Sequence, residues 1–206
     1  MLTIWGRTNS VNVKKVLWAV HELEVPHERI DAGGAFGLVN DAEYRAMNPN
    51  GLVPLLKDGD LVLWESNAIL RYLCAKFGAG SLWAEDPAER AIGDKWMDWA
   101  TSNLAGPYRD VFWNLVRMTP ETRDDAAVER GRTACSALLA RVDQALADKP
   151  YLSGETFRMG DIPLACFAYG WYEMPIERPH LPNLDAWYAR VRERPAFATA
   201  VAVPLT

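Results

Sequence analysis

The sequence predicts an α/β domain followed by an all-helical domain. Strand-like and helix-like patterns alternate over residues 1–77, in the order β-α-β, then a loop or short helix, then β-β-α. From residue 87 onward the apolar residues recur almost entirely at helical spacing. Glycines and an Asp-Pro pair separate the two patterns, so we expect domains at 1–77 and 87–206 joined by a linker at 78–86.

The first βαβ unit is predicted within residues 2–31. Leu2 to Trp5 is a short apolar run that predicts a strand. Residues 27–31 predict a second strand, parallel to the first because a helix connects the two. The apolar residues of that helix recur every three or four positions: Val13, Val16, Leu17, Val20 and Leu23.

A hairpin and a third helix complete the first domain. Residues 53–57 and 61–64 flank Asp58-Gly59-Asp60, and Asp-Gly supplies the positive φ angles that a tight turn needs. Ser66 is the predicted N-cap of the helix that follows. Its apolar residues Ile69, Leu70, Leu73 and Phe77 recur at helical spacing.

The second domain is predicted to contain two long helices and three shorter ones. The first long helix should bend near Gly106-Pro107, because proline interrupts helical hydrogen bonding. Trp96 and Trp171 are interpreted as packing residues. The second long helix is expected within 122–148, and the shorter ones near 161–171, 183–193 and 195–201.

Composition and charge exclude several classes of protein. Half of the 206 residues are apolar, which excludes a disordered chain. No apolar run approaches the ~20 residues that cross a bilayer, and the start lacks a signal-peptide layout, so we expect a cytoplasmic protein without a membrane partner. Residues 1–77 hold 8 basic and 9 acidic side chains, and the rest hold 14 and 18. Neither part is basic, which argues against nucleic acid as a partner.

Metal and disulfide chemistry have little support in the sequence. The cysteines are far apart without a C-x-x-C pair, and the histidines lack metal-ligand spacing. We therefore predict no metal site, and we interpret the cysteines as small buried apolar residues. These residues are Cys74, Cys135 and Cys166, and His21, His27 and His180.

A proline stands at the start of the predicted hairpin. A cis Val53–Pro54 peptide would leave the Val53 amide and carbonyl facing outward, able to bind an extended peptide like an added strand. A trans proline on an edge strand is the simpler reading, because only about 5–6% of X–Pro bonds in folded proteins are cis.

Two helix starts carry polar groups that suit a small charged ligand. At Glu65-Ser66, helix N–H groups and the Ser66 hydroxyl could bind a carboxylate while Glu65 takes an amine. From these residues alone, an ordinary N-cap with an acid in the first turn is the simpler interpretation. At the bend over residues 7–12, Ser10 is either an N-cap or a donor to a bound thiolate, with Asn12 nearby. Lowering a thiol pKa from about 8.5 to near 6.5 requires about 2.7 kcal/mol. One or two charge-assisted hydrogen bonds of roughly 1.5–3 kcal/mol each could supply it.

The order of these features resembles the cytosolic glutathione S-transferase family, and in particular its bacterial serine/threonine-type members, theta-like or nu-like. The resemblance covers the whole chain. It is carried by N-P-N-G-x-V-P at 48–54, Glu65-Ser66, Gly160-Asp161-Ile162-Pro163 and Pro182-Asn183-Leu184. It implies a thioredoxin-like first domain that binds glutathione, a helical second domain that holds a hydrophobic substrate, no cofactor beyond glutathione as cosubstrate, and a homodimer.

The resemblance also implies roles for individual residues. Val53 would pair through its backbone with the cysteinyl unit of glutathione and Pro54 would be cis, while Glu65 and Ser66 hold the γ-glutamyl end. Ser10 would stabilise the thiolate with help from Asn12; Thr8 and Asn9 remain alternative donors. Two positions depart from the family pattern. Leu52 stands where many relatives bind the glycyl carboxylate with a basic or amide residue, and Arg158 replaces the Ser or Thr of a capping box with Asp161.

The expected substrate is a small hydrophobic electrophile in a pocket between the domains. Candidate pocket residues lie on the first long helix of the second domain: Trp99, Asn103, Tyr108 and Trp113. The reaction would be conjugation of glutathione to the electrophile. Two alternatives stay open: glutathione-dependent reduction of a disulfide or peroxide at the same site, and a non-catalytic member that binds ligands or proteins.

Overall fold

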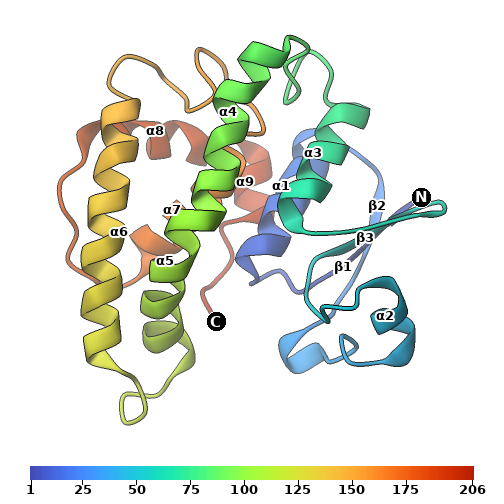
Figure 1. Ribbon diagram of the computed structural model, residues 1–206, viewed down its shortest axis with the longest axis horizontal. Helices are drawn as coiled ribbons and strands as arrows, with labels where there is room; N and C mark the ends of the chain where they lie inside the picture. The colour runs from blue at the N-terminus through green and yellow to red at the C-terminus, as the bar shows by residue number, and fades with distance from the viewer.

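The computed structural model describes residues 1–206 and contains one four-stranded sheet near the N-terminus (Figure 1). The strand order is β2-β1-β3-β4. Strand β1 pairs in parallel with β2 and antiparallel with β3, and β3 and β4 form the predicted hairpin. The strands are β1 (Leu2–Trp5), β2 (His27–Ile30), β3 (Leu55–Asp58) and β4 (Leu61–Trp64).

Helices cover both faces of this sheet. Alternate strand residues point to opposite faces, so Ile4 and Leu56 enter the main core while Leu55 enters a small second core with Tyr44. The main core lies under α1 (Val11–Glu22) and α3 (Ser66–Phe77), and the small one under α2 (Ala42–Met47). A 3₁₀ turn, η1 (Gly34–Phe36), leads from β2 toward α2. This arrangement confirms the predicted β-α-β, short helix, β-β-α order.

The remaining residues form helices, as expected. Asp86 caps the first of them, because its carboxylate accepts from the Ala88 and Glu89 N–H groups at 2.8 and 2.9 Å. The helices are α4 (Pro87–Trp99), α5 (Ala105–Phe112), α6 (Asp125–Ala145), α7 (Ile162–Glu173), α8 (Pro182–Arg192) and α9 (Pro195–Ala200). No helix in the fold combines the length and the hydropathy that crossing a membrane requires.

Gly106-Pro107, where a bend was expected, lies inside α5, and a π-helical segment stands on either side of this helix. The two segments are η2 (Ala100–Leu104) and η3 (Trp113–Arg117). The Ala105 N–H bonds to the Ala100 carbonyl five residues earlier, and Met118 bonds in the same way to Trp113. A π turn is wider than an α turn, so it changes which side chains share a face of the helix.

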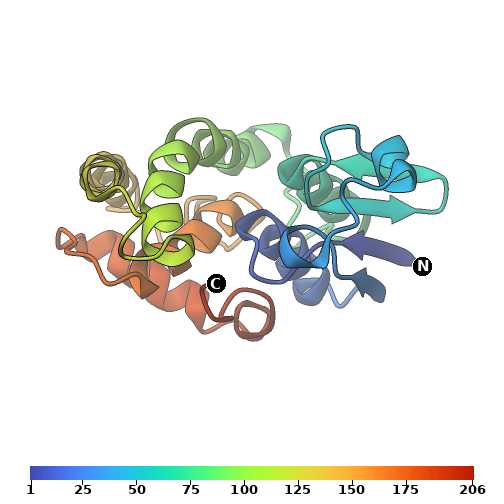
Figure 2. The same cartoon turned by 90° about the horizontal axis from the view of Figure 1, so that it is seen from below.

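One hydrophobic core of 45 buried residues extends through both parts of the chain. Trp18 of α1 stacks on Phe157 at 5.4 Å and meets the edge of Phe197 at 5.2 Å, which joins the sheet layer to the helical layer. Figure 2 shows α1 beside α7 and α9. Trp171 is buried in this core and Trp96 packs against it, which confirms both as packing residues. The three cysteines are free and buried, also as predicted.

The start of α7 is anchored by a buried carboxylate. Asp161 is fully buried and accepts hydrogen bonds from the Leu152 N–H at 2.8 Å and from Trp187 Nε1 at 2.9 Å. The Ser153 and Arg158 N–H groups add longer bonds at 3.4 Å. Four donors therefore converge on this side chain although the reciprocal capping box is lost. Burial raises the pKa of Asp161 against the effect of these bonds.

One helix start differs from its prediction. Ser66 is the first residue of α3 rather than its N-cap, and Glu65 occupies the N-cap position with φ +72°. The chain reverses sharply after β4, which requires this positive φ. The adjoining β3 strand begins at Leu55, two residues later than expected, because the cis Val53–Pro54 peptide precedes it.

Candidate active site

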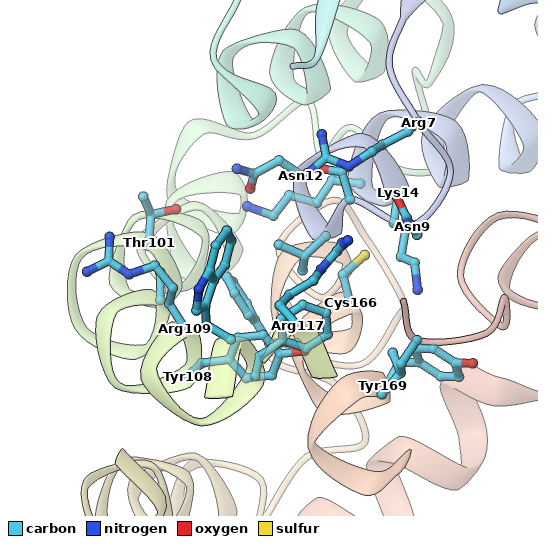
Figure 3. A pocket seen from close by; sticks show the side chains of 18 of the residues that line it. Arg7, Asn9, Asn12, Lys14, Thr101, Tyr108, Arg109, Arg117, Cys166 and Tyr169 are labelled. Carbon is cyan, nitrogen blue, oxygen red and sulfur yellow. The ribbon is translucent and has the colours of Figure 1, made fainter. Parts of the chain in front are cut away.

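A cavity of about 450 Å³ lies between the N-terminal sheet layer and the helical layer (Figure 3). The bend before α1 and the first turn of α1 form one wall. The η2–α5–η3 helix forms the opposite wall, and α7 with the C-terminal segment closes the remaining side. Both predicted thiolate-stabilising residues, Ser10 and Asn12, line it.

Ser10 occupies the N-cap position of α1 with extended backbone angles, φ −86° and ψ 124°. Its carbonyl accepts the first helical bond, from the Lys14 N–H at 2.9 Å, while its hydroxyl makes no capping bond. The hydroxyl is therefore free to donate to a ligand at the positive end of the helix dipole.

The alternative donors in this bend are less suitable. Asn9 lines the cavity, but its Nδ2 donates to the Thr206 carbonyl at 3.3 Å and also contacts the Thr206 hydroxyl. Thr8 is exposed and does not line the cavity. Ser10 is thus the free hydroxyl that the bend presents to the cavity.

A hydrogen-bond network joins Asn12 to Ser66 and to a buried lysine. The Ser66 hydroxyl donates to Asn12 Oδ1 at 3.3 Å, and Lys15 Nζ donates to the Ser66 hydroxyl at 3.3 Å. The Asn12 Nδ2 donors are left free by this arrangement. Lys15 is 1% exposed, and burial lowers its pKa to about 8. The sequence analysis missed Lys15, although a lysine on the apolar face of a helix is a signal for a special environment.

The loop before β3 presents its main chain. The cis Val53–Pro54 peptide has the geometry that the resemblance implied, and the Val53 N–H and carbonyl make no hydrogen bond within the chain. The preceding carbonyl, of Leu52, is fixed by the Tyr44 hydroxyl at 2.6 Å and by Asn48 Nδ2 at 2.9 Å. The Leu52 side chain itself is 65% exposed. The loop therefore has its Leu52 carbonyl held by two hydrogen bonds and carries two free backbone groups at Val53.

Glu65 and Ser66 lie at the junction of β4 and α3. Glu65 is exposed and forms no ion pair, so its carboxylate is free, while Ser66 is buried. Glu65, Ser66 and the loop over 52–54 lie outside the lining of the cavity, and the Ser66–Asn12 bond connects this surface to it.

The helical wall contains only part of the predicted electrophile pocket. Tyr108 and Trp113 line the cavity, whereas Trp99 and Asn103 do not. Trp99 packs edge-on against Trp96 at 5.3 Å, and the Asn103 amide donates to the Ser102 hydroxyl at 2.9 Å. At about 100° per residue, Trp99 lies nearly opposite Tyr108 around a regular helix, so these two side chains do not share a face.

Tyr108 contributes its ring rather than its hydroxyl. A Cβ on Gly170 would lie 1.8 Å from the Tyr108 hydroxyl, so that hydroxyl packs into α7. Burial raises the Tyr108 pKa well above its ordinary value. Tyr108 therefore shapes the cavity without offering a proton to it.

Cys166 and Lys14 lie on the side closed by α7. Burial raises the pKa of the Cys166 thiol to about 12, which keeps it protonated at neutral pH. Lys14 Nζ donates to the Val201 carbonyl at 2.8 Å and lies 4.3 Å from the centre of the Tyr169 ring. Burial lowers its pKa to about 8. Three arginines that the sequence analysis also missed complete the lining: Arg7, Arg109 and Arg117.

Comparison with known proteins places this fold and site in one family. The glutathione S-transferase N-terminal domain matches residues 9–76, and the glutathione S-transferase C-terminal domain matches residues 109–195. Glutathione S-transferase GstB of Escherichia coli strain K12 is 49% identical over the full length of both chains. Glutathione S-transferase F14 of Arabidopsis thaliana is 34% identical, covering 96% of this chain and 80% of its own.

A solved structure is similar over the whole molecule. It is the theta class glutathione S-transferase of Xanthomonas axonopodis pv. citri with glutathione bound, with a TM-score of 0.97, 56% identity, and coverage of 100% of this chain and 99% of that one. The chain belongs to the glutathione S-transferase family, which confirms the family and the thioredoxin-like plus all-helical fold class expected from its motifs.

Proposed function

We propose that the protein binds reduced glutathione, stabilises its thiolate with the Ser10 hydroxyl, and transfers it to an electrophile in the adjacent cavity. The observation that carries this proposal is the Ser10 hydroxyl, which has no capping bond and lies at the positive end of α1 in the cavity wall. The bound glutathione named for the Xanthomonas structure, at 56% identity, supports the choice of cosubstrate.

The polar surface beside the cavity suits the two ends of this peptide. The free Val53 N–H and carbonyl would pair with the cysteinyl unit like a neighbouring strand. The free N–H groups in the first turn of α3, beginning with that of Ser66, would take the γ-glutamyl carboxylate, and the free Glu65 carboxylate would take its amino group. Lys15, buried behind Ser66, adds positive charge at this end.

Ser10 then lowers the thiol pKa. A hydrogen bond to the charged form of sulfur, together with the dipole of α1, favours the thiolate. Asn12 is placed to assist, because Ser66 holds its Oδ1 and leaves the Nδ2 donors free.

The chemical step uses the sulfur of glutathione as nucleophile. The sulfur forms a bond to carbon while the leaving group departs with its electron pair, and the thiol proton passes to solvent. No covalent enzyme intermediate is required, so the acceleration comes from the thiolate fraction and from positioning. The homodimer and the hydrophobic electrophile stay predictions from the resemblance, and the cytoplasmic location stays a prediction from the sequence.

The test compares Ser10→Ala with Thr8→Ala and Asn9→Ala. Calorimetry measures glutathione binding, and ultraviolet absorbance between pH 5 and 9 measures the thiol pKa in the complex. We expect Ser10→Ala to bind glutathione within about threefold of the unchanged protein. Its bound thiol pKa should rise by a unit or more, with conjugation of a chlorinated aromatic compound at pH 6.5 falling about tenfold or more.

The two neighbouring variants should change neither quantity. A low thiol pKa that survives in Ser10→Ala, or moves in Thr8→Ala or Asn9→Ala, would assign the donor elsewhere. Turnover of a disulfide or hydroperoxide without conjugation would make the protein a reductase. The absence of binding at millimolar glutathione would favour a non-catalytic role.

A further inference from the structure

The cavity is positively charged although the chain is acidic overall. The chain carries 27 acidic and 22 basic side chains, a net charge of −5. No Asp or Glu side chain lines the cavity, whereas five basic ones do. The cavity lining is basic although the chain as a whole is acidic, so the positive charge is a property of this site. The five residues are Arg7, Lys14, Lys15, Arg109 and Arg117.

Two of these arginines lack the partners that buried donors normally have. The Nε atoms of Arg7 and Arg117 are buried and make no hydrogen bond, and no other arginine in the chain is in this state. Lys14 and Lys15, in contrast, are satisfied by the Val201 carbonyl and the Ser66 hydroxyl. Because buried polar groups are nearly always hydrogen-bonded, the Arg7 and Arg117 donors point to a ligand that accepts from them.

Arg7 and Arg117 come from opposite walls (Figure 3). Arg7 follows β1 and packs over the glycine loop, where a Cβ on Gly33 would lie 2.8 Å from its Nη1. Arg117 ends η3, with its guanidinium 5.7 Å from the centre of the Phe112 ring. Burial, and next the charge of Arg117, lower the pKa of Arg7, so the two cations are close enough to repel each other. An anion between them would remove that repulsion.

We propose that Arg7 and Arg117 bind the carboxylate of the electrophile, so that the preferred substrates are electrophiles that carry an acidic group on an apolar body. This inference rests on the proposed function and specifies its substrate. A planar guanidinium matches a carboxylate through two parallel N–H donors. The apolar body would contact the rings of Phe112 and Trp113, which line the same wall as Arg117.

The carboxylate could also come from the glycyl end of glutathione, since Leu52 offers no charge there. A Cβ on Gly33 would lie 3.3 Å from Val53 Cγ1 as well as beside Arg7, so Arg7 is near the loop assigned to the cysteinyl unit. Arg117 belongs to the opposite, helical wall with Trp113. Because the two arginines come from opposite walls, we assign the carboxylate between them to the electrophile rather than to glutathione. The experiments below distinguish these two sources.

The experiment compares two matched substrates, 4-chloro-3,5-dinitrobenzoate and the uncharged 1-chloro-2,4-dinitrobenzene. In both, the glutathione sulfur forms a bond to the chlorine-bearing carbon, and chloride leaves with the bonding pair. The measured quantity is the ratio of kcat/KM for the acid to kcat/KM for the uncharged compound. We expect Arg117→Met and Arg7→Met each to lower this ratio about ten- to hundredfold. Arg141→Met, on the exposed face of α6, should leave it unchanged.

A binding measurement identifies the source of the carboxylate. Calorimetry compares glutathione with its glycyl monoethyl ester in each variant. If the arginines hold the electrophile, the ester and glutathione should show the same affinity ratio in Arg7→Met and Arg117→Met as in the unchanged protein. If instead the preference for glutathione over the ester disappears in these variants, the arginines bind the glycyl carboxylate and the proposal is wrong.

A second binding measurement does not depend on turnover. The unreactive pair 3,5-dinitrobenzoate and 1,3-dinitrobenzene can be titrated into the protein with no glutathione present. The acid should bind more tightly, and Arg117→Met should abolish that preference. If the unchanged protein bound the acid preferentially but conjugated neither substrate, the proposed function would be wrong while the anion site would be supported. Equal binding of the two compounds would contradict the anion site.

Discussion

The two sides of the site are built differently. The side proposed to bind glutathione, called the glutathione wall here, consists of Ser10 in the cavity lining and the adjoining surface at Val53 and Glu65. It relies on the main chain: the free Val53 groups beside a cis peptide, the positive φ of Glu65, and the extended N-cap at Ser10. The helical wall relies on side chains such as Trp113 and Arg117, carried by a helix with two π-helical segments. A wall made of backbone suits one constant ligand, a peptide. A wall made of side chains can be changed one residue at a time and suits the variable substrate.

The largest expected effect comes from removing a buried anchor of the helical layer, Asp161 at the start of α7. Asp161→Ala would leave the Leu152 N–H and Trp187 Nε1 buried without an acceptor, at about 1–3 kcal/mol for each donor. We expect a loss of about 3 kcal/mol or more in the free energy of unfolding, measured by urea denaturation.

The glutathione wall should be lost in the same transition, because the 45-residue core is continuous through both parts. Glutathione binding and tryptophan fluorescence should therefore give one midpoint. Two separate midpoints would mean that the walls fold independently. Asp125→Ala, at an exposed carboxylate on α6, is the control.

The next prediction concerns the glutathione wall and the stability of Lys15→Met as a function of pH. Burial lowers the pKa of Lys15 to about 8 in the folded chain, below its ordinary value of 10.5 in the unfolded chain. Below pH 8 the ammonium is charged in both states and its burial costs stability. Between pH 8 and about 10.5 the folded chain loses the proton first, so that cost falls as pH rises.

Lys15→Met should therefore be more stable than the unchanged protein by about 1–3 kcal/mol near pH 7. This gain should shrink toward pH 10. Its affinity for glutathione should fall, because the charge behind Ser66 is lost. Urea denaturation at pH 7, 8.5 and 10 gives the profile, with the exposed Lys95→Met as control. A gain that does not change with pH would show that Lys15 keeps its proton in the folded chain throughout this range.

The smallest expected effects concern Glu65, where the positive φ of the backbone and the carboxylate of the side chain can be tested separately. Glycine adopts positive φ without strain, so Glu65→Gly should be about 0.5–1 kcal/mol more stable than Glu65→Ala. Both variants lack the carboxylate, so both should lose the same amount of glutathione affinity, about fivefold. Urea denaturation and calorimetry measure the two quantities. If Glu65→Ala bound glutathione as well as the unchanged protein, the carboxylate would have no part in binding.

Local residue types predicted the strands around the glutathione wall, whereas the cis Val53–Pro54 peptide was implied only by the family resemblance. Asp58-Gly59 predicted the hairpin, and Pro54 marked the start of its first strand. Sequence reasoning placed the N-cap of α3 at Ser66 instead of Glu65, because a positive φ at a glutamate has no local signal in the sequence. The helical wall was only half predicted. The sequence indicated this helix but not which of its side chains face the cavity, and Trp99 and Asn103 do not line it.

The arginines were missed for a different reason. Arg7 and Arg117 are 110 positions apart in the chain, and only the packing of α1 against the helical layer brings them to one cavity. A long polar side chain in a loop or at a helix end is ordinarily solvated. Nothing in the neighbouring residues indicates that these two would have buried nitrogen atoms.

The C-terminal segment limits how the protein can be handled at the bench. Leu205 lines the cavity, Thr206 meets the Asn9 amide, and the Val203 carbonyl accepts from the Tyr169 hydroxyl at 2.7 Å. Met1 is 85% exposed at the start of the inner strand β1, at the end of the sheet away from the helical layer (Figure 1). A purification tag or a sensor-surface linker at the C-terminus would therefore emerge beside the cavity. The same attachment at Met1 would lie away from the cavity.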